Sequence, residues 1–382
     1  MGASTDVLRV GVGAGILGLP HAGIARYVLD MLTAVLTLDP RIRLYLYAGR
    51  AIEPSLPPGN WVLRVDAKRR WLGETYWLQQ ECPRWMAQDG IEVFWGQSYM
   101  LPLRLAHPCA RVVTLHDTTG VLYPDTMLLR RRINSRLHLG AALRVATRVV
   151  TDSLSTARLA RLLFGVPTER MVTIYPGFTN RIRRPSQSTA ASIVRKQFGL
   201  DAPYILTVGT VEPRKNLPIL LDVLEAETKL PVLVVAGREG WRSRGTMQRI
   251  RDLQRRSRLR YLGRVEDADL GALYAAAQFM VYPSLYEGFG LPVLEAMACG
   301  CPVVCSRASS IPEVGGQAAR YFAPVDREDL RRQMKLVLSD RHLREQMVRS
   351  GLVQAGRFSV RKAGEELAAL FHEVAGKPSL GT

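Results

Sequence analysis

The sequence contains no run of apolar residues long enough to cross a lipid bilayer, which takes roughly 18 residues or more. Its opening segment, MGASTDVLRV, lacks the basic region that precedes the apolar core of a secretory signal peptide. Asp6 stands where a myristoylation motif needs Ser or Thr. We therefore predict a soluble protein that is not secreted.

Cysteine is scarce, and the odd count of five argues against a disulfide framework. Cys299, Cys301 and Cys305 lie close together, but no fourth ligand stands nearby at zinc spacing. Free cysteines otherwise pack as small apolar residues. Asp267 and Asp269 resemble a metal-binding pair, yet they directly precede a helical run and suit its N-terminus. We expect no metal and no cofactor.

Acidic residues are few relative to basic ones, since 34 Asp and Glu face 52 Lys and Arg, for a formal net charge of +18. Such an excess permits nucleic acid, an anionic membrane surface or an anionic substrate as partner. No RNA-binding aromatic signature or paired Cys/His finger accompanies the basic runs. We expect no nucleic-acid partner, and a basic nucleic-acid-binding protein stays an alternative of another class.

Residues 61–85 hold four of the six tryptophans, Trp61, Trp71, Trp77 and Trp85, around the basic run 68–70. Basic and aromatic residues together favour an anionic membrane interface. Ordinary aromatic packing is the alternative, and co-sedimentation with anionic vesicles would distinguish the two.

Strand-like and helix-like segments alternate along almost the whole chain, which is typical of parallel βαβ units. With 382 residues, 47% of them hydrophobic, the chain is long enough for two cores. A polar, Ser-rich stretch at 181–196 interrupts the alternation. We predict an α/β protein with two doubly wound, Rossmann-like domains, whose ligands bind at the carboxyl ends of strands.

The first predicted strand runs into GAGILG, residues 13–18, which resembles the glycine fingerprint of a dinucleotide-binding turn. That fingerprint needs its third glycine inside the opening helix and an acidic residue about 20 positions further on. Here Pro20 delays the helix to about Gly23, and the first acidic residue beyond the second strand is Glu53. We therefore reject an oxidoreductase and expect a glycine loop whose amides, at a helix start, face an anion.

The segment YPSLYEGFGLPVLEAMACGCPVVCS, residues 282–306, combines carboxylates, glycines and a helix start. A predicted strand ends in a loop with Glu287, and a helix opens near Pro292. The glycines let the backbone approach a ligand, and the helix start offers N–H groups to oxygen atoms. Glu295 follows Glu287 by eight residues, so both carboxylates can face one pocket. Such acceptors suit the hydroxyls of a sugar or ribose beside a diphosphate.

EGFGLPVLEA resembles the E-x7-E motif of the retaining nucleotide-sugar glycosyltransferases of family 4, and the resemblance covers nearly the whole chain. The donor half of that family is similar to VGTVEPRKNL (208–217), VVAGREGW (234–241), VEDADLGALYAAAQFMVYPSLYEGFGLPVLEAMACG (265–300) and SSIPEVGG (309–316). Its acceptor half is similar to HAGIARYV (21–28), VVTLHDTTGVLYP (112–124) and VTIYPGF (172–178). The resemblance implies a GT-B fold, with two Rossmann-like domains facing across a cleft.

This fold implies a division of the chain. We expect an N-terminal acceptor-binding domain at 1–184, a linker at 185–200, and a nucleotide-sugar-binding domain at 201–360. A C-terminal helix within 361–382 would return to the N-terminal domain.

The resemblance also implies roles for single residues. Lys215, with Arg214, would bind the donor diphosphate and neutralise its charge without a metal. Glu295 would hold the ribose hydroxyls, and Glu287 the sugar and phosphates. Gly23 would approach the diphosphate from the other domain. The remaining donor-site residues would be Gly209, Thr210, Gly288, Phe289, Gly290 and Leu291.

His116 closes a predicted strand and matches the family's active-site histidine, which would bond the transferred sugar or stabilise the transition state. A core histidine bonded to backbone is the alternative, and Asp117 would orient the ring or cap the next turn. Many relatives have arginine where this chain has Thr210, and we hypothesise that Arg214 supplies the missing charge. No carboxylate pair stands out as a double-displacement nucleophile, so the resemblance implies retention by front-face attack with the leaving phosphate as base.

The implied activity is transfer of a hexose to a saccharide or lipid-linked saccharide in cell-envelope polysaccharide synthesis. Because acceptors in this family are often lipid-linked, the resemblance also implies a cytoplasmic location, with peripheral attachment to the cytoplasmic face of the inner membrane as a hypothesis. GTVEPRKN and LHDTTGVLYP resemble segments of bacterial polysaccharide mannosyltransferases, which favours GDP-mannose as donor; a UDP-glucose or UDP-GlcNAc donor is the alternative. A GT-B-like hydrolase or epimerase would bind the same donor without forming a glycan.

Overall fold

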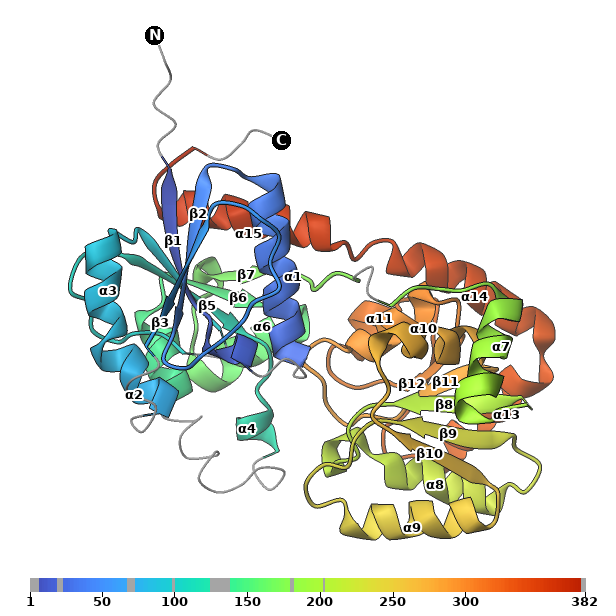
Figure 1. The fold of residues 1–382 in the computed structure, drawn as a ribbon. Helices are drawn as coiled ribbons and strands as arrows, with labels where there is room; N and C mark the ends of the chain where they lie inside the picture. The colour runs from blue at the N-terminus through green and yellow to red at the C-terminus, as the bar shows by residue number, and fades with distance from the viewer. Residues whose placement is uncertain are drawn as a thin grey trace. The chain divides into compact units, whose positions relative to one another are not determined.

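The computed structural model describes residues 7–18, 23–66, 73–97, 100–123, 138–178, 182–201 and 203–378. The chain divides into two compact units (Figure 1). Unit 1 comprises Met1–Leu122, Leu128–Gly177 and Ser359–Thr382, and unit 2 comprises Tyr123–Met127 and Phe178–Phe358.

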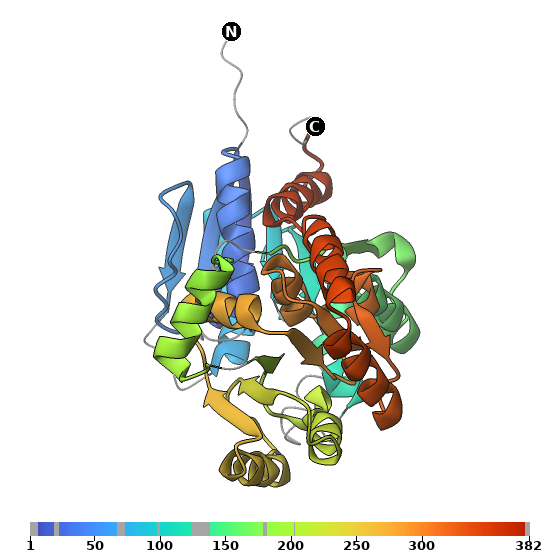
Figure 2. The same cartoon turned by 90° about the vertical axis from the view of Figure 1, so that its right-hand side faces the viewer.

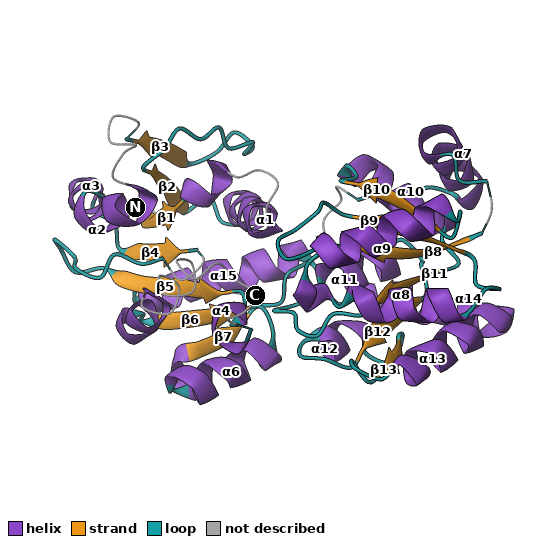
Figure 3. Ribbon diagram, turned by 90° about the horizontal axis from the view of Figure 1, so that it is seen from below, coloured by secondary structure: helices purple, strands orange, loops and turns teal. Residues whose placement is uncertain are grey.

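Unit 1 is built on a seven-stranded sheet with the order β3-β2-β1-β4-β5-β6-β7, in which every pair of neighbours is parallel (Figure 3). This order is that of a doubly wound Rossmann sheet, and it reverses between β1 and β4. The strands are β1 (Leu8–Gly13), β2 (Ile42–Ala48), β3 (Trp61–Val65), β4 (Val93–Gly96), β5 (Ala110–Leu115), β6 (Arg148–Thr151) and β7 (Met171–Thr173).

Helices cover both faces of this sheet. They are α1 (Gly23–Leu38), α2 (Gly73–Gln80), α3 (Cys82–Asp89), α4 (Thr119–Leu122), α6 (Leu154–Phe164) and α15 (Val360–Val374), with short 3-10 turns at η1 (Gly15–Gly18) and η4 (Thr168–Arg170). Because side chains alternate along a strand, Leu44 and Leu46 pack with α1 and α15, whereas Tyr45 and Tyr47 pack with α2 and α3. The strands are therefore buried on both sides and read as continuous apolar runs.

The last helix, α15, belongs to unit 1 although the chain reaches it from unit 2, and it lies against α1 (Figure 1). Gly364 allows this close packing, since a Cβ there would come within 2.4 Å of the Cβ of Ala34. His372 Nε2 lies 2.8 Å from Asp39 Oδ2, and both side chains are almost fully buried. This contact ties α15 to the turn that joins α1 to β2.

Unit 2 repeats the plan with a six-stranded parallel sheet of order β10-β9-β8-β11-β12-β13. The sheet reverses between β8 and β11. The strands are β8 (Tyr204–Val208), β9 (Val232–Ala236), β10 (Leu259–Gly263), β11 (Phe279–Tyr282), β12 (Val303–Ser306) and β13 (Arg320–Phe322).

The helices of unit 2 are α7 (Gln187–Phe198), α8 (Leu217–Ala226), α9 (Arg244–Arg255), α10 (Asp267–Ala276), α11 (Leu291–Ala298), α12 (Ile311–Gly315), α13 (Arg327–Ser339) and α14 (Arg341–Ala355), with a 3-10 turn η5 (Pro213–Lys215). Apolar residues of α8, α9 and α13 form one core with the sheet. Asp267 and Asp269 lie in the first turn of α10, where they complement the helix dipole.

Residues 185–200 differ from the predicted linker. Most of them form α7, which packs against α10 within unit 2 (Figure 2). The Ser186 hydroxyl caps the helix by accepting from the backbone N–H of Thr189. Ala190 and Val194, four residues apart, give it one buried face. The units accordingly change at Phe178, not near residue 185.

Candidate functional site

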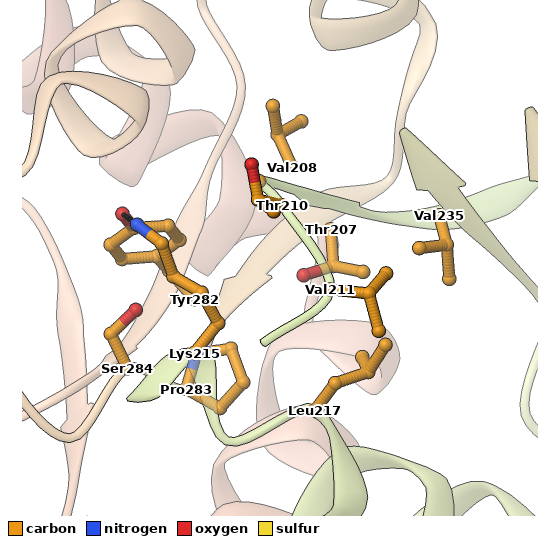
Figure 4. Close-up of a pocket in the computed structure, with 11 residues that line it drawn as sticks. Thr207, Val208, Thr210, Val211, Lys215, Leu217, Val235, Tyr282, Pro283 and Ser284 are labelled. Atoms are coloured by element: carbon orange, nitrogen blue, oxygen red, sulfur yellow. Dashed lines mark hydrogen bonds between the residues drawn. The ribbon is translucent and has the colours of Figure 1, made fainter. Parts of the chain in front are cut away.

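A pocket opens at the carboxyl ends of β8 and β11, the two strands between which the order of the unit 2 sheet reverses (Figure 4). Doubly wound sheets bind their ligands at this position. The pocket is lined by Thr207, Val208, Gly209, Thr210, Val211, Lys215, Leu217, Val235, Tyr282, Pro283 and Ser284.

Two glycines shape the pocket's backbone. Gly209 has φ of 143°, and a Cβ on Gly237 would lie only 1.9 Å from the carbonyl oxygen of Gly209. The ends of β8 and β9 therefore approach so closely that no other residue fits at 237. After β8 and Gly209, the chain turns into η5, which presents Lys215 to the pocket.

Four charged side chains meet beside the pocket. Lys215 Nζ donates to Glu287 Oε1 at 2.7 Å and to the Tyr282 hydroxyl at 2.8 Å. Arg214 Nη1 donates to Glu287 Oε2 at 2.9 Å, and its Nη2 donates to Glu212 at 2.7 Å. The Tyr282 hydroxyl completes the set by donating to Glu287 Oε1 at 2.9 Å. We call Arg214, Lys215, Tyr282 and Glu287 the cation cluster.

Electrostatics keep the carboxylate of this cluster charged. Burial alone would raise the pKa of Glu287, but the charges of Lys215 and Arg214 outweigh burial and hold it at about 2. Burial lowers the pKa of Lys215 below its usual value. Lys215 has three N–H donors, of which two are used within the described residues, so the third can serve a ligand in the pocket.

The loop that follows Glu287 is held by two serines. Ser310 Oγ donates to the carbonyls of Glu287 and Phe289, and the backbone N–H of Glu287 donates to Ser309 Oγ at 2.8 Å. Gly290, with φ of 109°, then begins α11 in a conformation that favours glycine. Further along α11, Glu295 Oε2 accepts from the Tyr274 hydroxyl at 3.0 Å.

Part of the predicted donor site lines the pocket described above. Gly209, Thr210 and Lys215 line the pocket, and the carboxylate of Glu287 contacts Lys215. Glu287 itself does not line this pocket, and its oxygens accept from Arg214 and Lys215. Nor do Arg214, Gly288, Phe289, Gly290, Leu291 or Glu295 line it.

In unit 1, His116 immediately follows β5 and is 9% exposed. Its Nδ1 lies 2.7 Å from Asp152 Oδ2, at the end of β6, and Tyr27 of α1 packs edge-on against the ring at 4.9 Å. The partner is a carboxylate, so the alternative of a histidine bonded to backbone does not describe this contact. Burial lowers the pKa of His116, but Asp152 outweighs it, and the net pKa lies above the usual value.

Two further predictions fall in unit 1. Asp117 accepts from the backbone N–H of Thr119 at 2.9 Å, so it caps the turn and does not orient His116. Gly23 is the exposed first residue of α1, with open space where a Cβ would be. In the glycine loop, a Cβ on Gly15 would lie 2.1 Å from the Glu74 carboxylate. That carboxylate pairs with Arg50 and accepts from the backbone N–H of Gly49, so it links the loop to the end of β2.

Several site residues were missed by the sequence analysis. Tyr282 is the last residue of β11 and Ser284 lies two residues beyond it, at the carboxyl end where parallel sheets bind ligands, but nothing in the sequence distinguishes them from core residues. Asp152 follows β6 in the same way, and its contact with His116 depends on β5 and β6 being neighbours. Glu212 lies two residues before Arg214, a spacing that carries no signal.

Among the described residues, no group of three metal-ligating side chains occurs, and the five cysteines are free thiols. No helix in the described ranges is long and apolar enough to cross a membrane. Trp77 is buried against Trp85 at 5.5 Å, so these two rings pack in unit 1. Trp71 and the basic run 68–70 lie outside the described residues.

Comparisons with known proteins agree with this geometry. The family profile "Glycosyltransferase Family 4" matches residues 21–179, and "Glycosyl transferases group 1" matches residues 190–353. The O-antigen chain mannosyltransferase B of Escherichia coli is 33% identical over 360 residues, which cover 89% of this chain and 93% of the relative.

Solved structures share the fold. Sucrose-phosphate synthase from Thermosynechococcus elongatus superposes with a TM-score of 0.79 at 19% identity, covering 97% of this chain and 99% of the other. HepE from Anabaena, solved with UDP-glucose, gives a TM-score of 0.75 at 19% identity, covering 96% and 100%. The chain therefore belongs to the family 4 glycosyltransferases and has their GT-B fold, as the E-x7-E motif predicted.

Proposed function

We propose that the protein transfers mannose from GDP-mannose to a saccharide or lipid-linked saccharide acceptor in cell-envelope polysaccharide synthesis. The transfer retains the anomeric configuration and needs no metal. The similarity to an O-antigen mannosyltransferase over 93% of its length supports this choice of donor and process. A UDP-hexose donor is the alternative.

The observation that carries the proposal is the cation cluster beside the pocket of unit 2. Breaking the bond between a sugar and a nucleoside diphosphate places negative charge on the leaving phosphate, and fixed cations stabilise that charge. Lys215 is largely buried, with its side chain 17% exposed, and is oriented by Glu287 and Tyr282 before any ligand arrives. Its position in the pocket suits the diphosphate, and Glu287 fixes both cations.

The test is a thermal-shift panel of GDP, UDP, ADP, NAD and the matching nucleotide sugars, in the presence of EDTA. A ligand that binds only the folded chain raises the transition temperature according to its affinity. We expect GDP and GDP-mannose to raise the transition temperature. In a separate transfer assay with EDTA present, we expect mannose to be transferred. A shift with UDP and UDP-hexoses alone would change the donor, and a shift with NAD alone would refute the proposal.

The hypothesis that Arg214 replaces the arginine of relatives at position 210 gives a separate prediction. We expect Arg214→Ala to raise the donor KM about tenfold or more, because one of two cations is lost. Adding Thr210→Arg, which restores a cation directly in the pocket lining, should recover part of the loss. Arg249→Ala is the matched control, since Arg249 pairs with Asp222 and Glu225. An unchanged donor KM in Arg214→Ala would refute the hypothesis.

A further inference from the structure

Several buried polar side chains of unit 1 have an atom without a hydrogen-bond partner among the described residues, and three of them, Gln97, His116 and Asp152, follow neighbouring strands. Neither amide atom of Gln97 has a partner among the described residues, nor has Nε2 of His116 or Oδ1 of Asp152. The exposed fractions of the three residues are 3%, 9% and 6%. Buried polar groups in proteins almost always have partners, so a set of orphaned atoms calls for an explanation.

Strand register places these three side chains together. Gln97, His116 and Asp152 each directly follow a strand, and these strands, β4, β5 and β6, are neighbours in the sheet. Leu115 is paired with Thr151, so the next residues, His116 and Asp152, meet at the edge of the sheet. All three side chains follow the carboxyl ends of their strands. The first of these strands, β4, is next to β1, and the strand order reverses between the two.

The same register puts them on one face of the sheet. Trp95 is paired with Val112, and both pack in the core that contains α1. Gln97 lies two residues beyond Trp95, which for alternating side chains is the same face. Trp95 Nε1 donates to Thr114 Oγ1 at 2.9 Å, and His116 lies two residues beyond Thr114.

The chemistry of the orphaned atoms indicates the kind of ligand. Asp152 Oδ1 is an acceptor, and its carboxylate would repel a phosphate. Since Asp152 Oδ2 accepts a hydrogen bond from Nδ1–H of His116, Nε2 of the neutral ring is an acceptor. The Gln97 amide both donates and accepts. Hydroxyl groups satisfy this mixture, because each one donates and accepts. A pyranose offers several of them on a rigid ring.

We propose that Gln97, His116 and Asp152 form a subsite for the hydroxyl groups of a saccharide, with Gln97 as a specificity-determining residue. This inference rests on the proposed function for the identity of the sugar, which is either the hexose of the donor or the acceptor. The orphaned amide destabilises the empty protein, and sugar hydroxyls satisfy it on binding.

The test compares Gln97→Leu with a matched control in the same unit, Gln79→Leu. Gln79 Nε2 donates to the Leu101 carbonyl, and its Oε1 accepts from the N–H of Leu103. Removing the orphaned amide should leave the transition temperature unchanged or raise it, whereas removing the bonded amide should lower it. If Gln97→Leu lowers it as much as the control, the amide is a structural group and the proposal is overturned.

Sugar binding is measured with methyl α-D-mannopyranoside and methyl α-D-glucopyranoside by saturation-transfer NMR, and with GDP-mannose, GDP, UDP-glucose and UDP by calorimetry. We expect Gln97→Leu to weaken sugar recognition about tenfold or more, and Gln97→Asn to weaken it less. Loss confined to the nucleotide sugar, with the free nucleotide unaffected, assigns the subsite to the donor hexose. Loss confined to the methyl glycosides assigns it to the acceptor.

Unchanged binding of all of these ligands by Gln97→Leu would overturn the proposal, and so would a wild-type chain that binds neither glycoside and does not distinguish a nucleotide sugar from its nucleotide. Failure of the proposed function looks different, because the wild-type chain would then bind no nucleotide while the glycosides still report on the subsite.

Discussion

Replacing Glu287 with glutamine is expected to reduce transfer about 100-fold and to destabilise unit 2 at neutral pH. The carboxylate accepts from both cations of the cluster, and the Nε2 of a glutamine would face one of them. Lys215 and Arg214 would then lose the partner that orients them. In the proposed function these two cations face the leaving phosphate, and orientation of such groups contributes factors of this size. Donor KM and kcat measured together report the loss.

The stability effect of Glu287→Gln depends on pH with a defined sign. The pKa of Glu287 is about 2 in the folded chain, against about 4.5 when it is unperturbed. The charged carboxylate therefore contributes roughly 3 kcal/mol above pH 4.5, and this contribution is lost as the pH falls from 4.5 to 2. We expect a difference in transition temperature of roughly 10 °C at pH 7 that shrinks with falling pH below 4.5.

Glu345→Gln is the control for this effect. Glu345 also pairs with an arginine, Arg341, but its side chain is 48% exposed, and such surface pairs contribute less than about 1 kcal/mol. A Glu287→Gln variant as stable at pH 7 as Glu345→Gln would contradict the cation cluster as described.

The fold was within reach of the sequence because its strands are buried on both faces. Runs such as VLVVA at 232–236 show no alternation of apolar and polar residues, and each is followed by helical or loop material. Parallel βαβ units were therefore predicted without knowing the strand order.

The stretch at 181–196 was misjudged because its serines were interpreted as a loop. Ser186 is a helix cap, and only two residues of α7, Ala190 and Val194, are buried.

The sequence singled out Lys215, Glu287 and His116 as candidate site residues, but it did not indicate their hydrogen-bond partners. Glu287 was expected to hold the sugar and phosphates. Its contact with Lys215, 72 residues earlier, follows from the adjacency of β8 and β11. Asp117 was considered as the partner of His116 because it is adjacent, yet the partner is Asp152, supplied by the neighbouring strand.

Replacing Asp152 with asparagine is the second substitution with a large expected effect. The carboxylate accepts a hydrogen bond from Nδ1–H of His116, and its charge raises the pKa of the ring. An amide lacks the charge that stabilises imidazolium, and it can donate to Nδ1, which would move the hydrogen to Nε2. We expect kcat to fall about 10- to 100-fold. The inflection of the kcat–pH profile that belongs to His116 should move to lower pH.

Asp39→Asn separates this positioning role from a structural one. Asp39 Oδ2 lies 2.8 Å from His372 Nε2 in the same unit, and both side chains are buried. Asp39 precedes β2, so this pair lies at the amino ends of the strands, away from His116. Asp39→Asn should lower the transition temperature and leave the pH profile in place. If Asp152→Asn lowers only stability, with kcat and the profile as in Asp39→Asn, then Asp152 supports the fold and His116 acts without it. A shifted profile in Asp152→Asn alone would instead make the contact between β5 and β6 part of the catalytic apparatus, with the carboxylate setting which nitrogen of His116 meets the sugar.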